Sequence, residues 1–325
     1  MLDTHDLSLL TAIKEHGTLV GAARALNVTP SAVTQRLQHL EKRLGMHLVD
    51  RTARRLHFTG EGEFLCARGK ELLERHRELM EEVMLRHGKL VGTLKINAPF
   101  GFGRKYLAET VARFSALHPH VEVLLKLSEQ PLLDERERFD MVLHIGELQN
   151  LGLIAHTIAP NSRFVCAAPE LLRRHGTPDS PQDLVNYPCI ALLENNEDTT
   201  LWTFTKNGRS HTVRIRPVLA SNDGGVAAAW AKSALGIIMR SQWDIAESVA
   251  RGDLVRLLPD WRLPDAPVIA LTHRRRGIPE RVTAFLALLK KHFAPVPPWQ
   301  AESSQSSRGT ERPLAAGGEH DIQQR

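Results

Sequence analysis

Cysteine is scarce in this chain of 325 residues, and the three cysteines that it has do not cluster. Cys66, Cys166 and Cys189 stand far apart and form no Cys-x-x-Cys pair. A disulfide framework or a structural zinc site needs several cysteines at close, regular spacing. We therefore expect no disulfide and no metal site, and a reducing compartment.

Long apolar runs are also missing. No stretch approaches eighteen consecutive apolar residues, and the first ten residues, MLDTHDLSLL, hold neither a basic segment nor a long apolar core. A membrane-spanning helix needs about 20 apolar residues, and a secretory signal needs both of the missing features. We expect a cytoplasmic protein that has no membrane span and no membrane partner.

The motifs of common enzyme classes are absent as well. The sequence has no Gly-x-Ser-x-Gly, no P-loop and no His-Glu-x-x-His, which are the motifs of hydrolases, nucleotide-binding proteins and metalloproteases. Gly101-Phe102-Gly103 lacks the third glycine of a dinucleotide-binding fingerprint, because Tyr106 stands at that place. We predict no catalytic residues, no cofactor and no enzymatic activity.

The composition is otherwise that of a globular protein of two or three domains, with 42% apolar and 24% charged residues. The net charge is only +5, but residues 1–60 hold eight lysines and arginines against five acids. Such a local excess of positive charge is required of a phosphate-binding surface. An ordinary solvated charged face is the alternative interpretation.

The first 59 residues have the pattern of three short helices followed by a hairpin. We expect helices at 6–16 and 19–26, the first of which ends at Gly17. The third helix has the clearest signals, since Thr29 is a good N-cap, Pro30 fits the first turn and Gly45 fits the end. Two short strands, 47–51 and 56–59, enclose a basic turn.

Residues 61–87 predict one long helix, in which Leu65, Leu72 and Leu79 recur every seven residues. Seven-residue spacing of leucine is typical of a helix that packs against a partner helix. A helix that packs on its own domain is the alternative. Charged neighbours and a position between two domains favour a linker and dimerisation helix over residues 60–90.

From Val91 onward strands alternate with helices, and we expect strands at 94–98, 121–127, 141–145, 163–168, 189–193, 212–216, 219–221 and 268–272. The predicted helices between and after them are 104–117, 224–235 and 279–293. This rhythm predicts an α/β fold with parallel sheets between helices. Proline, serine, glutamine and glycine dominate after Ala294, so we expect a disordered tail over 294–325.

The segment Gly17–Glu63 resembles the N-terminal domain of LysR-type transcriptional regulators. The matching features are Ala22-Ala23, Leu26, the stretch from Thr29 to Gly45, Arg51, Thr59 and Gly62. The resemblance continues through NAPFGFGRKYL, DMVLHIGEL, SNDGGVAAAW and LPDWRLPDA, so it covers about residues 1–293 and suggests the subgroup with a PFGFG loop. The family usually has phenylalanine at the place of Val49 and serine at the places of Thr18 and Thr34.

The resemblance implies a winged helix-turn-helix at 1–59, the linker helix, and an effector-binding domain at 91–293. That domain would have two α/β subdomains like those of periplasmic binding proteins, one over 91–161 and 267–293 and the other over 162–266, with a ligand cleft between them. The implied function is a sequence-specific DNA-binding transcription regulator, a homodimer or homotetramer, that a small effector modulates. The alternative is a solute-binding module fused to a DNA anchor without regulatory output.

A recognition helix presents its first turns to base edges in the major groove. Gln35 can pair with adenine, and Thr34 can contact thymine. Arginines suit phosphates or a narrow minor groove. Ser31 and Gln38, each taken singly, are as compatible with plain exposed polar residues. The predicted DNA-binding residues are Thr18, Thr29, Pro30, Ser31, Thr34, Gln35, Arg36, Gln38, Arg51, Arg54 and Arg55.

Two predicted strand ends precede helices and place free N–H groups toward the cleft, which suits a carboxylate. Arg240 is interpreted either as a partner for an anion or as a surface arginine, and Asp223 as a helix cap. Phe100 and Phe102 would supply apolar surface, so we expect a small carboxylate with a modest apolar part. The predicted effector-binding residues are Ala98, Pro99, Phe100, Gly101, His144, Gly146, Ser221, Asn222 and Arg240.

Overall fold

The computed structural model describes residues 2–50, 56–129, 139–146, 152–193, 199–273 and 278–301. The chain forms two compact units, residues 1–91 and 92–325. Arg51, Arg54 and Arg55 of the predicted wing lie outside the described residues, as does the predicted tail from 302 onward. Within the described ranges, no helix is both long enough and apolar enough to span a bilayer.

The N-terminal unit packs three short helices and a small hairpin against one long helix. Its elements are α1 (Thr4–His16), α2 (Leu19–Ala25), α3 (Pro30–Leu44), β1 (Val49–Asp50), β2 (His57–Phe58) and α4 (Gly60–Arg86). The shared core holds Leu10, Ile13, Val33, Leu37, Leu40 and Leu48, all fully buried. Helix α1 starts two residues before the prediction, because Asp3 and Asp6 form a capping box that satisfies two free backbone N–H groups.

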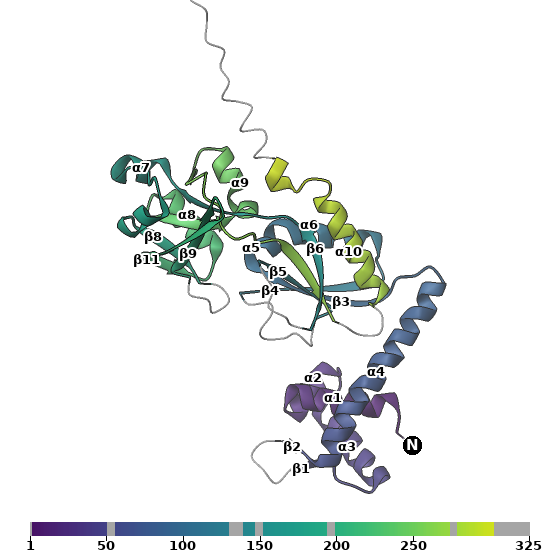
Figure 1. The fold of residues 1–325 in the computed structure, drawn as a ribbon. Helices are drawn as coiled ribbons and strands as arrows, with labels where there is room; N and C mark the ends of the chain where they lie inside the picture. Colours follow the sequence, from purple (N-terminus) through teal and green to yellow (C-terminus); the bar gives the residue numbers. More distant parts are fainter. Residues whose placement is uncertain are drawn as a thin grey trace, which may run out of the picture. The chain divides into compact units, whose positions relative to one another are not determined.

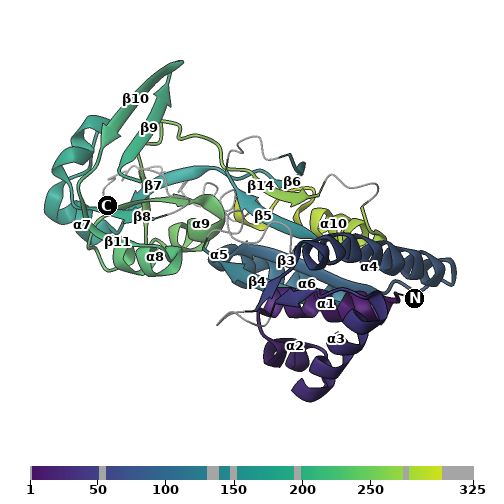
Figure 2. The ribbon, with the colours of Figure 1, turned by 90° about the horizontal axis from the view of Figure 1, so that it is seen from below.

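Two glycines let α4 approach the rest of this unit closely, and α1 runs alongside α4 in Figure 2. A Cβ on Gly62 would lie 2.1 Å from the carbonyl oxygen of Leu48, and a Cβ on Gly69 would lie 2.9 Å from a Leu7 methyl group. Residues with side chains cannot come this near without displacing their neighbours. The first turns of α4 therefore belong to the helix-turn-helix core.

The C-terminal unit contains two five-stranded sheets and thus two subdomains. Subdomain I has the order β4-β3-β5-β14-β6, and subdomain II has the order β11-β8-β12-β7-β13. The strands of subdomain I are β3 (Gly92–Pro99), β4 (Val121–Ser128), β5 (Met141–Ile145), β6 (Ile154–Ala159) and β14 (Val268–Thr272). Those of subdomain II are β7 (Arg163–Ala167), β8 (Cys189–Leu192), β11 (Pro217–Ser221), β12 (Ile237–Ser241) and β13 (Val255–Leu257).

Helices cover these sheets. In subdomain I, α6 and α10 lie together on the sheet (Figure 1), and α5 passes through one π-helical turn, Gly103–Leu107, into α6. The helices of subdomain I are α5 (Phe100–Phe102), α6 (Ala108–Leu117) and α10 (Glu280–Phe293). Those of subdomain II are α7 (Pro169–His175), the 3-10 helix Pro181–Asn186, α8 (Gly224–Lys232) and α9 (Gln242–Ala250).

The prediction of parallel sheets is wrong in part, because both sheets are mixed. Strand β3 pairs in parallel with β4 and β5, and β8 pairs in parallel with β11 and β12. In contrast, β14 runs antiparallel to β5 and β6, and β7 runs antiparallel to β12 and β13. The chain crosses from subdomain I to subdomain II between β6 and β7 and returns before β14, so these strands do not arise from βαβ units.

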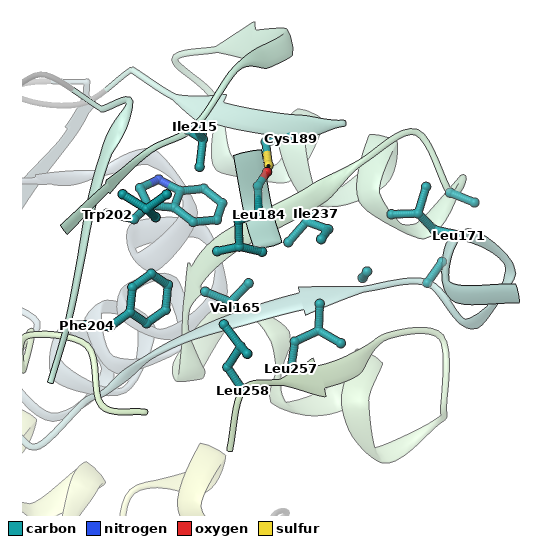
Figure 3. Close-up of a cluster of buried hydrophobic side chains, with 14 residues drawn as sticks. Val165, Leu171, Leu184, Cys189, Trp202, Phe204, Ile215, Ile237, Leu257 and Leu258 are labelled. Carbon is teal, nitrogen blue, oxygen red and sulfur yellow. Dashed lines mark hydrogen bonds between the residues drawn. The ribbon is translucent and has the colours of Figure 1, made fainter. Parts of the chain in front are cut away.

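An antiparallel hairpin of β9 (Leu201–Lys206) and β10 (Arg209–Arg214) covers part of subdomain II. Trp202 and Phe204 of β9 pack onto the apolar cluster that contains Val165 and Ile237 (Figure 3). The predicted strand at 212–216 is therefore part of a separate hairpin and does not join the main sheet. Asn207 and Gly208 have φ values of 51° and 74°, as a tight hairpin turn requires.

The predicted tail begins too early. Residues 294–301 follow α10 and end in a short helical turn whose Trp299 is fully buried. Its ring packs against Phe102, Tyr106 and Phe293, and its indole N–H donates to the carbonyl oxygen of Pro160 at 3.1 Å. Composition alone marked this segment as unable to fold, but one large aromatic side chain anchors it to the core.

Candidate functional site

The polar residues predicted on α3 lie on its exposed side. Val33, Leu37 and Leu40 are fully buried, whereas Ser31, Gln35 and Gln38 are exposed. Positions 31, 35 and 38 share one stripe of a helix, since each is three or four residues from the next. The stripe carries hydroxyl and amide groups, which are the groups that read base edges in a major groove.

Three predicted threonines also have local structural roles. Thr18 caps α2 by accepting a hydrogen bond from the Gly21 N–H at 3.0 Å. Thr29 caps α3 by accepting from the Ala32 N–H at 3.3 Å, with Pro30 next to it in the first turn. The Thr34 hydroxyl donates to the Pro30 carbonyl oxygen at 3.0 Å. These bonds fix both helix starts and leave hydroxyl groups at the surface.

The basic side chains of this unit differ in whether they have an acidic partner. Arg43 is paired with Asp6, and Lys14 is paired with Glu63. Arg24 and Arg36 are exposed and form no ion pair with any residue that the structure describes. Arg24 was not among the predicted residues, although a basic residue in the last turn of the helix before a recognition helix was a visible signal.

The heptad leucines of α4 do not all behave alike. Leu65 packs on the helix-turn-helix core beside the buried Cys66, so at this position the prediction of a dimer seam is wrong. Further along, 55% of Leu72 and 57% of Leu79 are exposed, and Met80, Val83 and Leu85 are exposed as well. The second half of α4 thus carries large apolar side chains that this unit does not bury.

A small cavity of about 60 Å³ lies between the two subdomains. Subdomain I contributes Pro99, Phe100, Gly101, Ser128, Glu129, His144 and Ile145, and subdomain II contributes Arg163, Asn222, Gly224, Arg240, Ser241 and Trp243. The carboxyl end of β3 and the start of α5 form one wall. The carboxyl end of β12 forms another, as expected for ligand sites of α/β sheets.

Six of the nine predicted effector residues line this cavity: Pro99, Phe100, Gly101, His144, Asn222 and Arg240. The other three do not. Ala98 is buried within β3, and the Ser221 hydroxyl accepts a hydrogen bond from the Asp223 N–H at 3.1 Å. Gly146 does not line the cavity, and its φ of 116° and its lack of a Cβ let the Arg163 guanidinium approach. Phe102 is fully buried and offers no surface to a ligand.

The cap of α8 is already formed within the chain. The Asp223 carboxylate accepts hydrogen bonds from the Gly225 N–H at 2.7 Å and the Val226 N–H at 3.1 Å, which confirms its interpretation as a cap. Arg104 of subdomain I binds the same carboxylate at 3.0 Å. Burial acts to raise the pKa of Asp223, but these hydrogen bonds outweigh it and the pKa is lowered. The Asp223 carboxylate therefore already occupies the N-terminus of α8, where sequence analysis had expected an effector carboxylate.

Arg240 also has an internal partner. Its guanidinium is buried and binds the Asp244 carboxylate, with the Nη2–Oδ2 distance at 2.6 Å and the Nε–Oδ2 distance at 2.8 Å. The alternative that Arg240 is a surface arginine is wrong, but its charge is compensated. Similarly, Asn222 Nδ2 donates to the Glu129 carboxylate across the cleft at 2.7 Å.

Arg163, which sequence analysis missed, is a cation in the lining of this cavity. Its guanidinium forms no ion pair or hydrogen bond with the residues placed in the structure. A Cβ on Gly146 would lie 3.3 Å from its Nη2 atom, so the group lies against the end of β5. The only signal in the sequence was a basic residue that opens the strand after the crossover between subdomains.

Two further residues of this cavity's lining, Phe100 and Trp243, have N–H groups that can donate hydrogen bonds. The helical run that starts at Phe100 has no side-chain cap on its first N–H groups, because Pro99 precedes it. Trp243 lines the cavity, and its buried indole N–H has no acceptor among the described residues. An uncapped helix start, an indole N–H and an arginine favour a ligand with an acceptor or anionic group.

The three cysteine thiols of this chain are poorly placed to react. All three cysteines are free and buried. Burial raises the pKa of Cys66 to about 11 and those of Cys166 and Cys189 to about 12. The thiolate is the reactive form, so these side chains are inert core residues near neutral pH.

Comparison with known proteins identifies both units. Residues 4–63 match the family described as "Bacterial regulatory helix-turn-helix protein, lysR family", and residues 87–294 match "LysR substrate binding domain". The HTH-type transcriptional regulator DmlR of Escherichia coli is 29% identical over 290 residues, which cover 89% of this chain and 94% of DmlR. The transcriptional activator TtdR of the same species is 30% identical over 256 residues, which cover 79% of this chain and 83% of TtdR.

Solved structures agree with this assignment. The structure of CrgA, a LysR-type transcriptional regulator from Neisseria meningitidis, matches with a TM-score of 0.57 and 25% identity, covering 90% of this chain and all of that one. The helix-turn-helix unit and the two-subdomain α/β unit thus occur together, in this order, in both chains. Because a family profile matches well over half of its residues, this chain belongs to the LysR-type family of transcriptional regulators.

Proposed function

We propose that the chain is a DNA-binding transcription regulator whose activity responds to a small anionic molecule in the cleft of its C-terminal unit. Its relatives are named as regulators and activators of transcription, which supports the regulatory output over a passive DNA anchor. Arg163 carries the anionic part of the proposal, because it places in the inter-subdomain cavity a positive charge that no described residue pairs.

The positions of the charges support one place for the anion within the cavity. Asp223 occupies the start of α8, and Glu129 at the Asn222 side repels a second carboxylate. The uncapped start of α5 and Arg163 remain, and both attract negative charge. We therefore place the anionic group of the effector between Phe100 and Arg163, and we place a hydrogen-bond donor of the effector, where it has one, toward Glu129.

Replacing Arg163 with glutamine should weaken binding of an anionic effector by about 1.5–3 kcal/mol, because one charge-assisted hydrogen bond is lost. Calorimetric titration with a panel of organic acids, amines and neutral sugars measures the change. Arg209→Gln at the exposed tip of the β9–β10 hairpin is the matched control. If the panel contains only neutral or cationic binders, or if Arg163→Gln binds the active acid as wild type does, the anionic site is wrong.

On the DNA side, we propose that Ser31, Thr34, Gln35 and Gln38 face the bases and that the arginines meet phosphates. The exposed stripe on α3 supports this arrangement, with Arg36 beside it on the same helix. Thr18, Thr29 and Pro30 would lie at the helix starts, where backbone N–H groups meet phosphate oxygens. Arg51, Arg54 and Arg55 retain their predicted role at the wing, and Arg24 joins them as a phosphate contact.

Gln35→Ala should weaken binding to a specific operator by about 1–3 kcal/mol and relax the base preference at one position. Arg36→Ala, one residue further, should weaken operator and random DNA alike and reduce the dependence of affinity on salt. Fluorescence anisotropy on both DNAs at several salt concentrations separates the two effects. Equal losses on both DNAs for Gln35→Ala would contradict a base contact.

Regulatory output can be tested directly. A reporter fused to the promoter adjacent to the gene should change its expression when the chain is deleted and when effector is added. A solute-binding module on a DNA anchor would leave expression unchanged. Because the proposed partner is chromosomal DNA, we place the protein in the cytoplasm, and we propose a homodimer or homotetramer assembled through the exposed apolar residues of α4.

A further inference from the structure

Subdomain II contains a second and larger cavity, of about 220 Å³. It lies at the carboxyl ends of β8 and β12, against the inner side of β9, whose Trp202 appears in Figure 3 beside the core. Its lining is mixed, with seven apolar residues (Ile190, Leu192, Leu201, Trp202, Met239, Leu263 and Pro264) and five polar or charged ones (Thr199, Thr203, Ser241, Arg163 and Arg240). No predicted effector residue except Arg240 lies in its wall.

The two cavities share part of their lining. Arg163, Arg240 and Ser241 border both, and Ser241 stands opposite Arg163 where β12 pairs with β7. Of the two arginines, Arg240 is neutralised by Asp244, whereas Arg163 has no partner in the described part of the chain. Within the described residues, a positive charge without an acidic partner thus stands at the boundary between the small cavity and the larger one.

The sizes of the cavities indicate what each can hold. An ordered water needs roughly 10–15 Å³ of such volume, and an apolar cavity of about 150 Å³ holds benzene. The first cavity, at about 60 Å³, can therefore hold a carboxylate but no ring. The second, at about 220 Å³, is large enough for a six-membered ring or a branched chain, and Met239 in its wall has an adaptable side chain.

We propose that the second cavity binds the apolar body of the effector, whose anionic group is held by Arg163 in the first cavity. The effector is then a monocarboxylate with a compact aromatic or branched hydrocarbon body, and a small polyanion is excluded. This inference rests on the proposed anion site, and it adds the chemical class of the rest of the molecule. It also moves the apolar contact from Phe100 and Phe102 to β8, β9 and β12.

Calorimetric titration of the full-length protein with acetate, isovalerate, benzoate and phenylacetate tests the class. Each buried methylene should tighten binding about fourfold, so we expect the tightest of the three larger acids to bind at least about 50-fold more tightly than acetate. Benzyl alcohol, which has the ring without the charge, should bind at least about tenfold more weakly than benzoate. Equal affinities for acetate and all larger acids would overturn the proposal.

Leu192→Trp should fill the second cavity, weakening binding of the tightest large acid at least tenfold while leaving acetate within about twofold. Leu201→Trp, at a more exposed position of the same cavity, should do the same and serves if Leu192→Trp does not fold. The matched control is Val218→Trp on the exposed side of the neighbouring strand β11, outside both cavities. We expect that control to change neither affinity.

The failures of the two proposals are distinguishable. If Arg163→Gln weakens all acids but neither tryptophan variant separates large acids from acetate, the anion site stands and the second cavity is not used. If no acid binds, or if Arg163→Gln changes nothing, the anionic effector is wrong as well. If benzyl alcohol matches benzoate, the cavity binds apolar molecules without Arg163, and a single ligand across both cavities is overturned.

Discussion

Trp299→Ala should lower the free energy of unfolding of the C-terminal unit by about 3–5 kcal/mol, the usual cost of removing a fully buried aromatic side chain. The ring fills the space among Phe102, Tyr106 and Phe293. Its indole N–H is bonded to the Pro160 carbonyl oxygen, and its own carbonyl oxygen accepts from Gln242 of subdomain II. Scanning calorimetry of the full chain should show the loss in the transition of this unit.

Two variants separate packing from the hydrogen bond. Trp299→Phe keeps an aromatic ring but loses the indole N–H. Its free energy of unfolding should therefore lie between those of the wild type and Trp299→Ala. Val296→Ala, in the same segment but with 51% of the side chain exposed, should be nearly neutral. If Trp299→Ala is as mild as Val296→Ala, the segment does not stabilise the core and Trp299 contributes little to folding.

Trp299 is also linked to the inter-subdomain cavity through the aromatic residues around it. Trp243 stacks edge-on against Phe102 and Tyr106, and Tyr106 donates a hydrogen bond to the Trp243 carbonyl oxygen at 3.0 Å. The aromatic cluster therefore connects the end of the chain with a residue of the inter-subdomain cavity. Because the same indole is bonded to Pro160, which lies between β6 of subdomain I and β7 of subdomain II, we expect weakening of the cluster to loosen the packing between the two subdomains.

The helix-turn-helix elements could be predicted closely because their signals are local. Thr29, Pro30 and Gly45 mark the ends of α3 in consecutive sequence, and the observed helix starts and stops at these residues. The β9–β10 hairpin had an equally local signal in Asn207-Gly208, which sequence analysis overlooked. Its burial against the sheet through Trp202 could not be predicted, because it depends on contacts with distant strands.

Sequence analysis predicted which strand ends line the inter-subdomain cavity, but it did not predict which charged side chains there have partners. The strand ends that hold Pro99, Gly101 and Asn222 follow from the α/β pattern, and these residues do line the cavity. The pairings of Arg240 with Asp244 and of Asn222 with Glu129 depend on side-chain geometry. Without those pairings, sequence analysis had no means of preferring Arg163 to Arg240 as the cation that has no partner among the described residues.

Leu72→Asp should have the largest effect on assembly. The proposed dimer seam begins where α4 leaves its own core, and Leu72 is the first heptad leucine that is exposed there. In a twofold interface each substitution occurs twice, and burying an unpaired carboxylate costs several kcal/mol. The free-energy cost of burying two carboxylates exceeds the stabilisation that most contacts between two paired helices provide. The dissociation constant of the dimer should therefore rise at least about 100-fold.

The loss of assembly should also reach the DNA. A dimeric helix-turn-helix protein binds two half-sites about one helical turn apart, so a monomer keeps only half of the base contacts. We therefore expect Leu72→Asp to weaken operator binding far more than Gln35→Ala does, while its affinity for a single half-site stays unchanged. Sedimentation velocity and anisotropy on full and half operators measure both effects.

Lys70→Asp is the matched control, because it adds negative charge to an exposed position two residues earlier, on the opposite side of the helix. It should leave the oligomer intact. If Leu72→Asp and Lys70→Asp sediment alike as wild-type oligomers, the apolar residues of α4 are not the interface. If both dissociate, charge alone weakens the assembly and the leucine seam is not specific. Only dissociation confined to Leu72→Asp supports the seam, since only that carboxylate would lie between the two helices.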